Sequence, residues 1–448
     1  MNEENIMGTM SEGKLLFKLS MPMILSVLVS SMYNIVDSIF VGRLGDDALT
    51  AISLSAPASS IMVAVYFGIS IGVNAILSRK LGQRDAAGVS RTAGNGFIAM
   101  FIAYALFLLF GIFGVNKYYA IQTSDSNIQN LGFAYTSIVT TMSFGLMLQS
   151  LVERLLSGTG KTIGSMAVLM SGAVVNIILD PIMIFGYFGF PAMGMSGAAI
   201  ATVIGQCCAG VVGLIFNLVI NKEIAFKIKA FIPDWRILRE TFAIAIPAML
   251  TYAINSILTF GMNQVLIGFT TLAPAVYIIY TRVQSFVTMP VWGIRNTIVS
   301  IISYNMGAKR AERVQRLIKL SIRSAISIMF FGTLMFELIP GPLMRIFSNS
   351  SEVETLGVAA FRTIGVTLIL SGITIMRGGI FQAMNSSTKT LVIGIVQAFS
   401  LLGSAAAIAQ LGRLELVWLA FPISEIIIFI LGTVYQRTIE RQYLSSKA

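Results

Sequence analysis

The chain contains no histidine, only two cysteines and few charged residues. Its 448 residues are 11% charged and 56% hydrophobic, with a mean hydropathy of +0.82, whereas a soluble domain is about 25% charged. This composition excludes an ordinary soluble protein. Without imidazole, any coupling to protons or cations must fall to carboxylates. Cys207 and Cys208 are adjacent on one predicted helix, which excludes a disulfide framework and favours packing thiols.

What the chain does have is long apolar runs. A membrane-spanning helix needs about 20 apolar residues, and the runs lack the strict alternation of β-barrel strands. The sequence therefore predicts an all-α polytopic membrane protein. Because its N-terminus is polar, we expect no signal peptide. The twelve predicted transmembrane helices lie at 16–42, 48–78, 92–115, 129–157, 163–188, 196–220, 238–268, 273–303, 317–339, 356–384, 390–411 and 414–436.

The net charge of +11 does not indicate nucleic-acid binding, because of where the charges lie. With the N-terminus in the cytoplasm, most lysines and arginines fall on cytoplasmic loops, as the positive-inside rule requires. The basic clusters 79–84, 222–229 and 309–316 are examples. We expect a monomeric, multi-pass protein of the plasma (cytoplasmic) membrane, with both termini cytoplasmic, membrane lipids as partners and no nucleic acid.

The second half of the sequence repeats the first. Pro22 aligns with Pro247 and Gly82 with Gly307, an offset of 225 residues in each case. Six spans per copy give both copies the same orientation, as in parallel repeats. The predicted domains are an N-terminal six-helix lobe at 1–221, a cytoplasmic linker at 222–240 and a C-terminal six-helix lobe at 241–448. Two pseudo-symmetric bundles of this kind are typical of alternating-access carriers.

Two carboxylates lie at membrane depth in the first lobe, where such groups are costly and usually functional. Asp37 lies 19 residues beyond Lys18, and Asp180 lies 19 residues beyond Lys161. At 1.5 Å per residue, about 28 Å of helix separates each acid from the lysine that marks the inner boundary. We therefore expect the two acids at matching heights.

Each acid has an asparagine one helical turn below it, on the same helix face: Asn34 below Asp37, and Asn176 below Asp180. The carboxylate oxygens can carry a proton or, together with Asn176 and Thr202, ligate a hard cation such as sodium. The sequence does not choose between the two ions. The simpler alternatives are that Asp180 caps a helix end and that Asp37 lies at the membrane interface.

Several short motifs occur in a fixed order along the chain: Pro22, Asn34-Ile35-Val36-Asp37, Val41-Gly42-Arg43-Leu44-Gly45, Asn176-Ile177-Ile178-Leu179-Asp180-Pro181, Gly194-Met195-Ser196-Gly197, Tyr304-Asn305-Met306-Gly307 and Val417-Trp418-Leu419-Ala420-Phe421-Pro422. Together they resemble the multidrug and toxic compound extrusion (MATE) family over essentially the whole chain. That family exports amphipathic, often cationic, compounds in exchange for protons or sodium.

The resemblance implies a site and a motion as well as a fold. Coupling falls to the first-lobe residues Asp37, Asn176, Asp180 and Thr202, and the first span bends at Pro22. No organic cofactor is implied, only the coupling ion, H+ or Na+, with the two acids and Asn176 as the sodium ligands. The chain departs from relatives that carry acids on spans 7 and 10, because span 7 has none and span 10 has an arginine.

Charged residues also lie within the predicted spans of the second lobe. Glu425 is midway along span 12, and Arg295 and Arg377 lie on spans 8 and 10. Because charges within the membrane usually pair, we expect Glu425 to pair with an arginine, as a structural pair or as a substrate contact.

The stretch 157–162 is similar to a phosphate-binding loop but lacks its first glycine, which excludes ATP binding.

We therefore expect a secondary active antiporter, not an enzyme. It would export amphipathic, cationic drugs or toxins in exchange for protons or sodium by alternating access. The alternatives are a lipid-linked precursor flippase of the wider superfamily and, from a different class, an ion-conducting channel. Twelve spans favour the exporter over the flippase, and the duplicated architecture favours a carrier over a channel.

Overall fold

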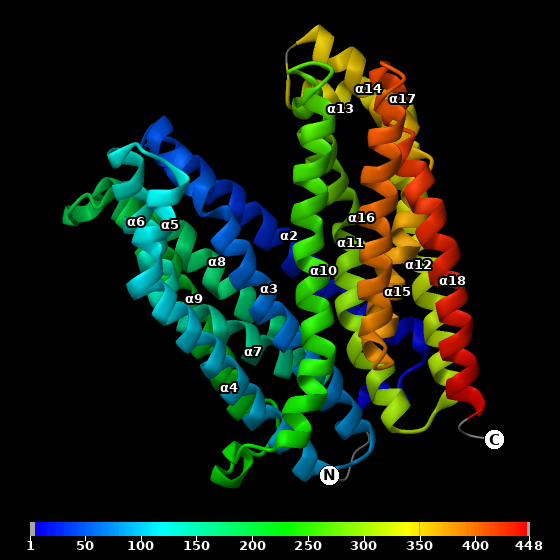
Figure 1. Ribbon diagram of the computed structural model, residues 1–448. Coiled ribbons are helices and arrows are strands. Elements are labelled where there is room, and N and C mark those ends of the chain that lie inside the picture. Colours follow the sequence, from blue (N-terminus) through cyan, green and yellow to red (C-terminus); the bar gives the residue numbers. More distant parts are fainter. Residues whose placement is uncertain (1–4, 349, 446–448) are drawn as a thin grey trace. The chain divides into compact units, whose positions relative to one another are not determined.

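In the computed structural model, which describes residues 5–348 and 350–445, every regular element is helical, so the all-α prediction is confirmed (Figure 1). The helices form two compact units. The first consists of Phe17–Ile246, Ser303–Lys309 and the described residues up to Met10; the second consists of Ser11–Leu16, Pro247–Ile302 and the residues from Arg310 onward. The segment 222–240, expected as a linker, lies within the first unit.

The first unit contains both long and short helices. In chain order they are α1 (Ile6–Thr9), α2 (Glu12–Gly42), α3 (Asp46–Gly82), α4 (Ala86–Leu109), η1 (Phe110–Gly114), α5 (Val115–Gln122), α6 (Ser126–Thr141), α7 (Phe144–Gly158), α8 (Thr162–Phe185), η2 (Tyr187–Gly189), α9 (Gly194–Val219) and η3 (Ile228–Phe231). The helix α10 (Trp235–Ile267) begins in this unit and passes into the second at Pro247.

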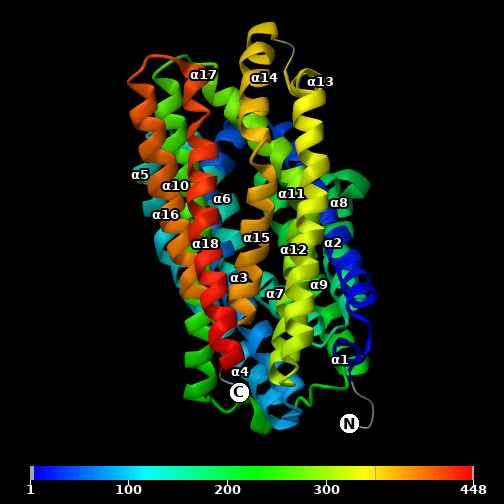
Figure 2. The same ribbon diagram turned by 90° about the vertical axis from the view of Figure 1, so that its right-hand side faces the viewer.

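The second unit has the same general build. Its helices are α11 (Ala273–Gly307), α12 (Ala311–Leu338), α13 (Pro340–Arg345), α14 (Ser351–Gly365), α15 (Leu368–Ala383), α16 (Ser387–Ala409), α17 (Leu414–Val417) and α18 (Ala420–Ser445). Within it, the long helices α12, α15, α16 and α18 run side by side, and the short helices α13 and α17 lie at one end (Figures 1 and 2).

Nine helices of the described chain are long and apolar enough to cross a membrane, or eleven when each of two bent pairs counts as one span. The sequence predicts twelve. The difference is α11, which covers the predicted span 273–303 but is not among these helices. Its polar residues, Arg282, Gln284 and Arg295 among them, lower its hydropathy. The polytopic membrane fold is clear from the remaining spans.

The sequence repeat is visible in the backbone. In each copy the fourth span is broken: α6 meets α7 at 46°, and α14 meets α15 at 57°. The turns match as well, because Arg84 and Lys309 both have positive φ, as do Gly160 and Asn385. Positive φ is uncommon for non-glycine residues, and asparagine tolerates it better than most. Asn385 therefore takes the conformation that a glycine takes in the first copy.

Two repeat-related glycines allow close helix packing in the first unit. A Cβ atom on Gly82 would overlap the carbonyl oxygen of Tyr304, and one on Gly307 would overlap that of Arg79. The ends of α3 and α11 thus pack backbone against backbone, each through its own glycine. A larger residue cannot be accommodated by rotating a side chain, because the obstructing atoms belong to the main chain.

We expect Gly307→Ala to lower the apparent melting temperature of the purified protein in detergent. Forcing one extra carbon into a packed contact costs about 1–3 kcal/mol. The matched control is Gly403→Ala, since no atom lies within 4 Å of its added Cβ, and alanine at a helix-interior position is favoured by about 0.5–1 kcal/mol. Equal melting temperatures for the two variants would contradict the backbone contact.

Candidate functional site

The two carboxylates predicted from the sequence lie together in the first unit, on different helices. Asp37 is on α2 and Asp180 is on α8, and their carboxyl groups contact each other. Asp180 is fully buried and Asp37 is half-buried. The helix α8 continues past Pro181 to Phe185, so Asp180 does not cap a helix end. It projects from within the helix, five residues before its last residue.

The contact between the carboxyl groups lacks a proton donor. One oxygen of each group, Oδ1 of Asp37 and Oδ2 of Asp180, is buried without a hydrogen-bond partner among the described residues. Ionised carboxylates only accept hydrogen bonds, and a buried acceptor without a donor is costly. A proton on either group, or a cation between them, would remove this cost.

Asn176 extends the site by one helical turn along α8. Its amide nitrogen donates to Asp180 Oδ1 at 3.1 Å and approaches Thr202 Oγ1 on α9 at 3.4 Å. Its own Oδ1 is buried without a donor among the described residues. The site therefore combines two carboxylates, one amide oxygen and one hydroxyl, which are the hard oxygen ligands that small cations prefer.

Glycines bring α8 and α9 close enough for this contact. A Cβ on Gly205 would lie 2.8 Å from the carbonyl oxygen of Gly172, and a Cβ on Gly172 would lie 3.1 Å from that of Gly205. Small residues at such positions let membrane helices approach backbone to backbone. Gly172 is one turn from Asn176 and Gly205 is about one turn from Thr202, so the same approach that joins the helices aligns the two side chains.

Asn34 does not join this network. Its side chain is exposed, and its amide donates to the carbonyl oxygen of Ser30 on the same helix at 2.7 Å. Asn34 lies three residues before Asp37 and Asn176 lies four residues before Asp180, so each is about one helical turn from its acid. Only Asn176 has a neighbouring helix, α9, that supplies a partner.

Two tyrosines near the carboxylates were not predicted. Tyr33 on α2 and Tyr135 on α6 are each close enough to both Asp37 and Asp180 to interact electrostatically. Tyr33 is one helical turn before Asp37, so its spacing is a signal that the sequence contains. Tyr135 has no such relation to either acid, and only the packing of α6 reveals it.

An apolar cluster closes the site at the end of the unit that carries the α2–α3 turn. Val41 and Ile184, each one turn beyond an acid, belong to this core with residues of α3 and α9. The rings of Phe40 and Phe185 meet edge to face at 6.4 Å. The carboxylates therefore lie directly beneath packed side chains, which lowers the local dielectric constant and strengthens their interactions.

The second unit does not form the predicted pair between Glu425 and Arg377. The Arg377 guanidinium donates to the Gln436 side chain at 3.0 Å, the Phe429 carbonyl at 2.9 Å and the Thr433 hydroxyl at 2.8 Å. These neutral acceptors lie one to three turns along α18 from Glu425. They occupy N–H donors of the Arg377 guanidinium. Glu425 contacts Ser371 instead, and its Oε2 has no partner among the described residues.

Arg295 is held elsewhere in the second unit. Its guanidinium lies over the ring of Trp292, 4.5 Å from the centroid, and its side chain packs against Gly379. Stacking on an aromatic ring is a common way to stabilise a desolvated arginine. Among the described residues, no group of three or more acids and cysteines is arranged to hold a metal ion.

Comparison with known proteins gives consistent matches over most of the chain. A family model described as MatE matches residues 22–182 and 247–405. The multidrug export protein MepA of Staphylococcus saprophyticus is 26% identical over 381 residues, covering 84% of this chain and 83% of its own. The FAD transporter of Shewanella oneidensis is 25% identical over 430 residues, covering 93% and 92%.

The fold is also found among solved structures. An outward-facing multidrug resistance MATE family transporter of the MOP superfamily superimposes with a TM-score of 0.92 at 22% identity, covering 99% of both chains. At that identity the match establishes the fold alone.

We expect Asn176→Ala and Asn34→Ala to differ in their effect on stability. Removing Asn176 leaves buried Asp180 without its donor, at a cost of about 1–3 kcal/mol, whereas removing Asn34 breaks one exposed bond within a helix. The apparent melting temperature in detergent should therefore fall for Asn176→Ala and stay near the wild-type value for Asn34→Ala. A larger fall for Asn34→Ala would show that the site has been assigned to the wrong asparagine.

Proposed function

The chain belongs to the MatE family of transporters, and on that basis we propose that it is an ion-coupled antiporter that exports amphipathic, cationic small molecules. Membership makes it a transporter, not an enzyme. MepA of Staphylococcus saprophyticus is named for multidrug export, which supports drug-like molecules as the cargo. The coupling ion, H+ or Na+, would move inward as the cargo moves outward.

The observation that supports this proposal most strongly is the carboxylate pair without a donor. Asp37 and Asp180 reach each other from different helices, so a proton or cation that binds both also fixes α2 against α8. Losing the ion restores repulsion between the two charges and frees α2. Ion binding and helix position are therefore linked, as an antiporter requires.

Sodium and a proton would use the site differently. For sodium, the three buried oxygens without donors, Asp37 Oδ1, Asp180 Oδ2 and Asn176 Oδ1, supply ligands, with Thr202 at the edge. For a proton, one hydrogen bond between the two carboxyl groups is enough. Either ion adds one positive charge to the carboxylate pair. The bound ion would therefore displace a cationic cargo.

Motion of the helix α2 would connect the site to alternating access. Pro22 lies inside α2, where a missing N–H and a ring clash weaken the helix. The Ser26 hydroxyl donates to the Pro22 carbonyl oxygen at 2.8 Å. The repeat places Pro247 at the equivalent position of α10, where the chain passes from one unit to the other. Both prolines would thus allow bending while each unit moves as a body.

An anionic cargo is the second candidate. A relative from Shewanella oneidensis is named as an FAD transporter, and the second unit carries Arg295 and Arg377. The Arg377 donors are, however, already bonded to α18, while the first unit presents carboxylate oxygens without donors at Asp37 and Asp180. These contacts favour a cationic cargo over an anionic one.

Transport in reconstituted vesicles tests the proposed function. Efflux of a cationic dye would be followed while a pH gradient and a sodium gradient are imposed separately, with FAD as the competing cargo. Dye efflux driven by one of the two gradients supports the antiporter. FAD efflux without dye efflux would show that the cargo is anionic. Dye flux without either gradient would indicate a channel.

Neutralising either acid should abolish coupling. We expect Asp37→Asn and Asp180→Asn each to reduce gradient-driven efflux by at least about tenfold, equivalent to losing about 1.4 kcal/mol of coupling, with expression unchanged. The matched control is Asp46→Asn, an exposed acid at the start of α3 in the same unit. Full activity of Asp37→Asn would remove the hypothesis.

Replacing Pro22 by alanine should slow transport and leave ion binding intact. Alanine restores the helical N–H and removes the ring clash, so α2 becomes harder to bend. We expect a lower maximal efflux rate at an unchanged half-saturating ion concentration, measured in the same vesicles. A wild-type rate would count against bending at this position.

A further inference from the structure

The segment that joins α9 to α10 presents an unusual surface for a connection. Three large apolar side chains are mostly exposed on it: Ile228 by 90%, Trp235 by 83% and Ile232 by 61%. Exposed basic residues lie between and beside them, at Lys227, Lys229, Arg236 and Arg239. The first unit thus carries an apolar and basic surface at the point where α10 begins.

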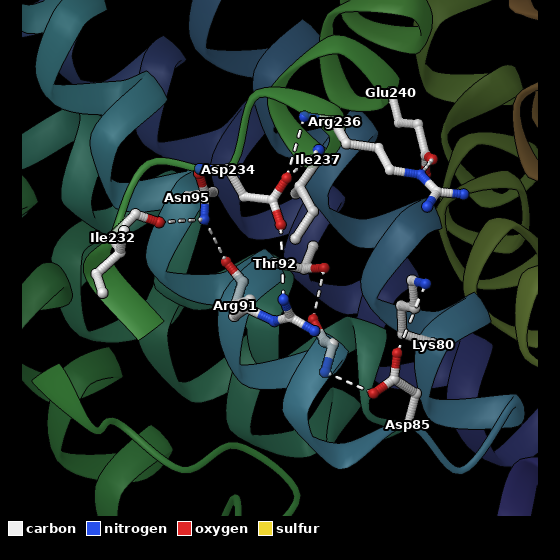
Figure 3. Close-up of polar contacts among 11 residues, drawn as sticks. Lys80, Asp85, Arg91, Thr92, Asn95, Ile232, Asp234, Arg236, Ile237 and Glu240 are labelled. Atoms are coloured by element: carbon white, nitrogen blue, oxygen red, sulfur yellow. Dashed lines mark hydrogen bonds and ion pairs between the residues drawn. The ribbon is translucent and has the colours of Figure 1, made fainter. Parts of the chain in front are cut away.

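The side chains point outward because the backbone beneath them is fixed to α4. The Asn95 amide donates to the Ile232 carbonyl oxygen at 3.3 Å, and its oxygen accepts from the Asp234 N–H at 2.8 Å (Figure 3). Gly94 on α4 leaves no room for a Cβ beneath the Ala230 carbonyl. Because Ala230 is buried, its neighbours in sequence turn away from the protein.

Aromatic packing holds the segment from a second direction. The Phe97 ring on α4 lies 6.2 Å from that of Phe226 and 5.8 Å from that of Phe231. Ile237 and Leu238, in the first turn of α10, are buried. The exposure of Ile228, Ile232 and Trp235 is therefore set by contacts on the opposite side of the segment.

The acidic residues of the segment are engaged within the protein. Asp234 Oδ1 accepts from the Arg236 N–H at 3.0 Å as an N-cap of α10, and its Oδ2 lies 3.7 Å from Arg91 (Figure 3). Glu223 Oε1 lies 3.4 Å from the Lys161 ammonium. Glu240 Oε1 lies 3.6 Å from Arg236 Nε, so it offsets the charge of that arginine. The charge presented outward is therefore basic, and Lys227, Lys229 and Arg239 supply most of it.

We propose that this surface, formed by Ile228, Ile232, Trp235 and the four adjacent basic residues, binds anionic phospholipid headgroups at the membrane interface. Tryptophan is enriched at that depth because its ring is apolar and its N–H is polar. Each nearby lysine or arginine adds attraction to an anionic leaflet. The site does not depend on which cargo the protein transports.

Its position in the chain favours the bilayer over an acidic soluble protein as the partner. The surface lies between the candidate spans α9 and α10, where the chain leaves one apolar run and enters the next, and α10 starts at Trp235 itself. Apolar side chains at this point continue the lipid-facing surface of the spans. An anchored Trp235 would fix the start of α10, the helix that passes from the first unit into the second.

Quenching of Trp235 by brominated lipid tests the proposal in the full-length protein. The chain has three tryptophans, so the emission of Trp235 is the difference between wild type and Trp235→Phe. Both proteins would be reconstituted in vesicles of phosphatidylcholine with about 30% phosphatidylglycerol, with bromine on the acyl chains of one lipid or the other. We expect brominated phosphatidylglycerol to quench this emission at least about threefold more per lipid than brominated phosphatidylcholine.

The basic residues should account for the preference. Replacing Lys227, Lys229, Arg236 and Arg239 by glutamine should equalise quenching by the two lipids. The control variant Arg43→Gln/Lys117→Gln, which removes two exposed basic residues elsewhere in the first unit, should keep the preference. Raising the salt to 0.5 M should weaken it in the wild type, which tests the electrostatic part without any variant.

Two results would overturn the proposal. Equal quenching of the wild-type protein by both lipids at low salt would show an interface contact without headgroup selection. No quenching by either lipid would place Trp235 outside the bilayer and leave an acidic soluble partner as the occupant of the surface.

Discussion

The structure of the first unit depends on holding two carboxylates in contact beneath an apolar core. Two unit charges about 4 Å apart repel by about 4 kcal/mol at an effective dielectric constant of 20, so the pair is stable only when a proton or cation neutralises one charge. Its geometry is imposed from outside: Gly172 and Gly205 bring α8 and α9 together, Asn176 holds Asp180, and Val41 with Ile184 closes the end. We propose that this geometry makes the contact between α2 and α8 depend on a bound ion.

The repeat in the sequence accounts for the helical framework of both copies but not for the carboxylate site. The broken fourth spans and the positive-φ turns recur in both copies, because backbone geometry is inherited with the helix pattern. The position equivalent to Asp37 is Met262, which is fully buried in α10, an ordinary packing residue. Glu425, an acid within a predicted span of the second unit, contacts Ser371 and lies on a helix that is not the counterpart of α2 or α8. The two copies therefore share a framework, while among the described residues the carboxylate pair occurs in the first copy alone.

Sequence reasoning found the helices and most of the site because both follow from spacing along single helices. Helix rise placed Asp37 and Asp180 at one height, and one helical turn placed Asn176 beside Asp180. Properties that depend on a neighbouring helix could not be found this way. Asn34, like Asn176, is about one turn from its acid but bonds within its own helix. Tyr135 comes from α6, and Arg377 reaches neutral acceptors on α18 instead of Glu425.

Exchange of a bound ion for cargo at the carboxylate pair can be measured directly. Purified protein in weakly buffered detergent solution would be mixed with a cationic drug while released protons are followed with a pH indicator and released sodium with an ion-selective electrode. We expect the wild type to release about one ion for each drug molecule that it binds. A variant in which both Asp37 and Asp180 are asparagine should release none. Drug binding with no ion release from the wild type, or undiminished release from the double variant, would contradict the proposed exchange.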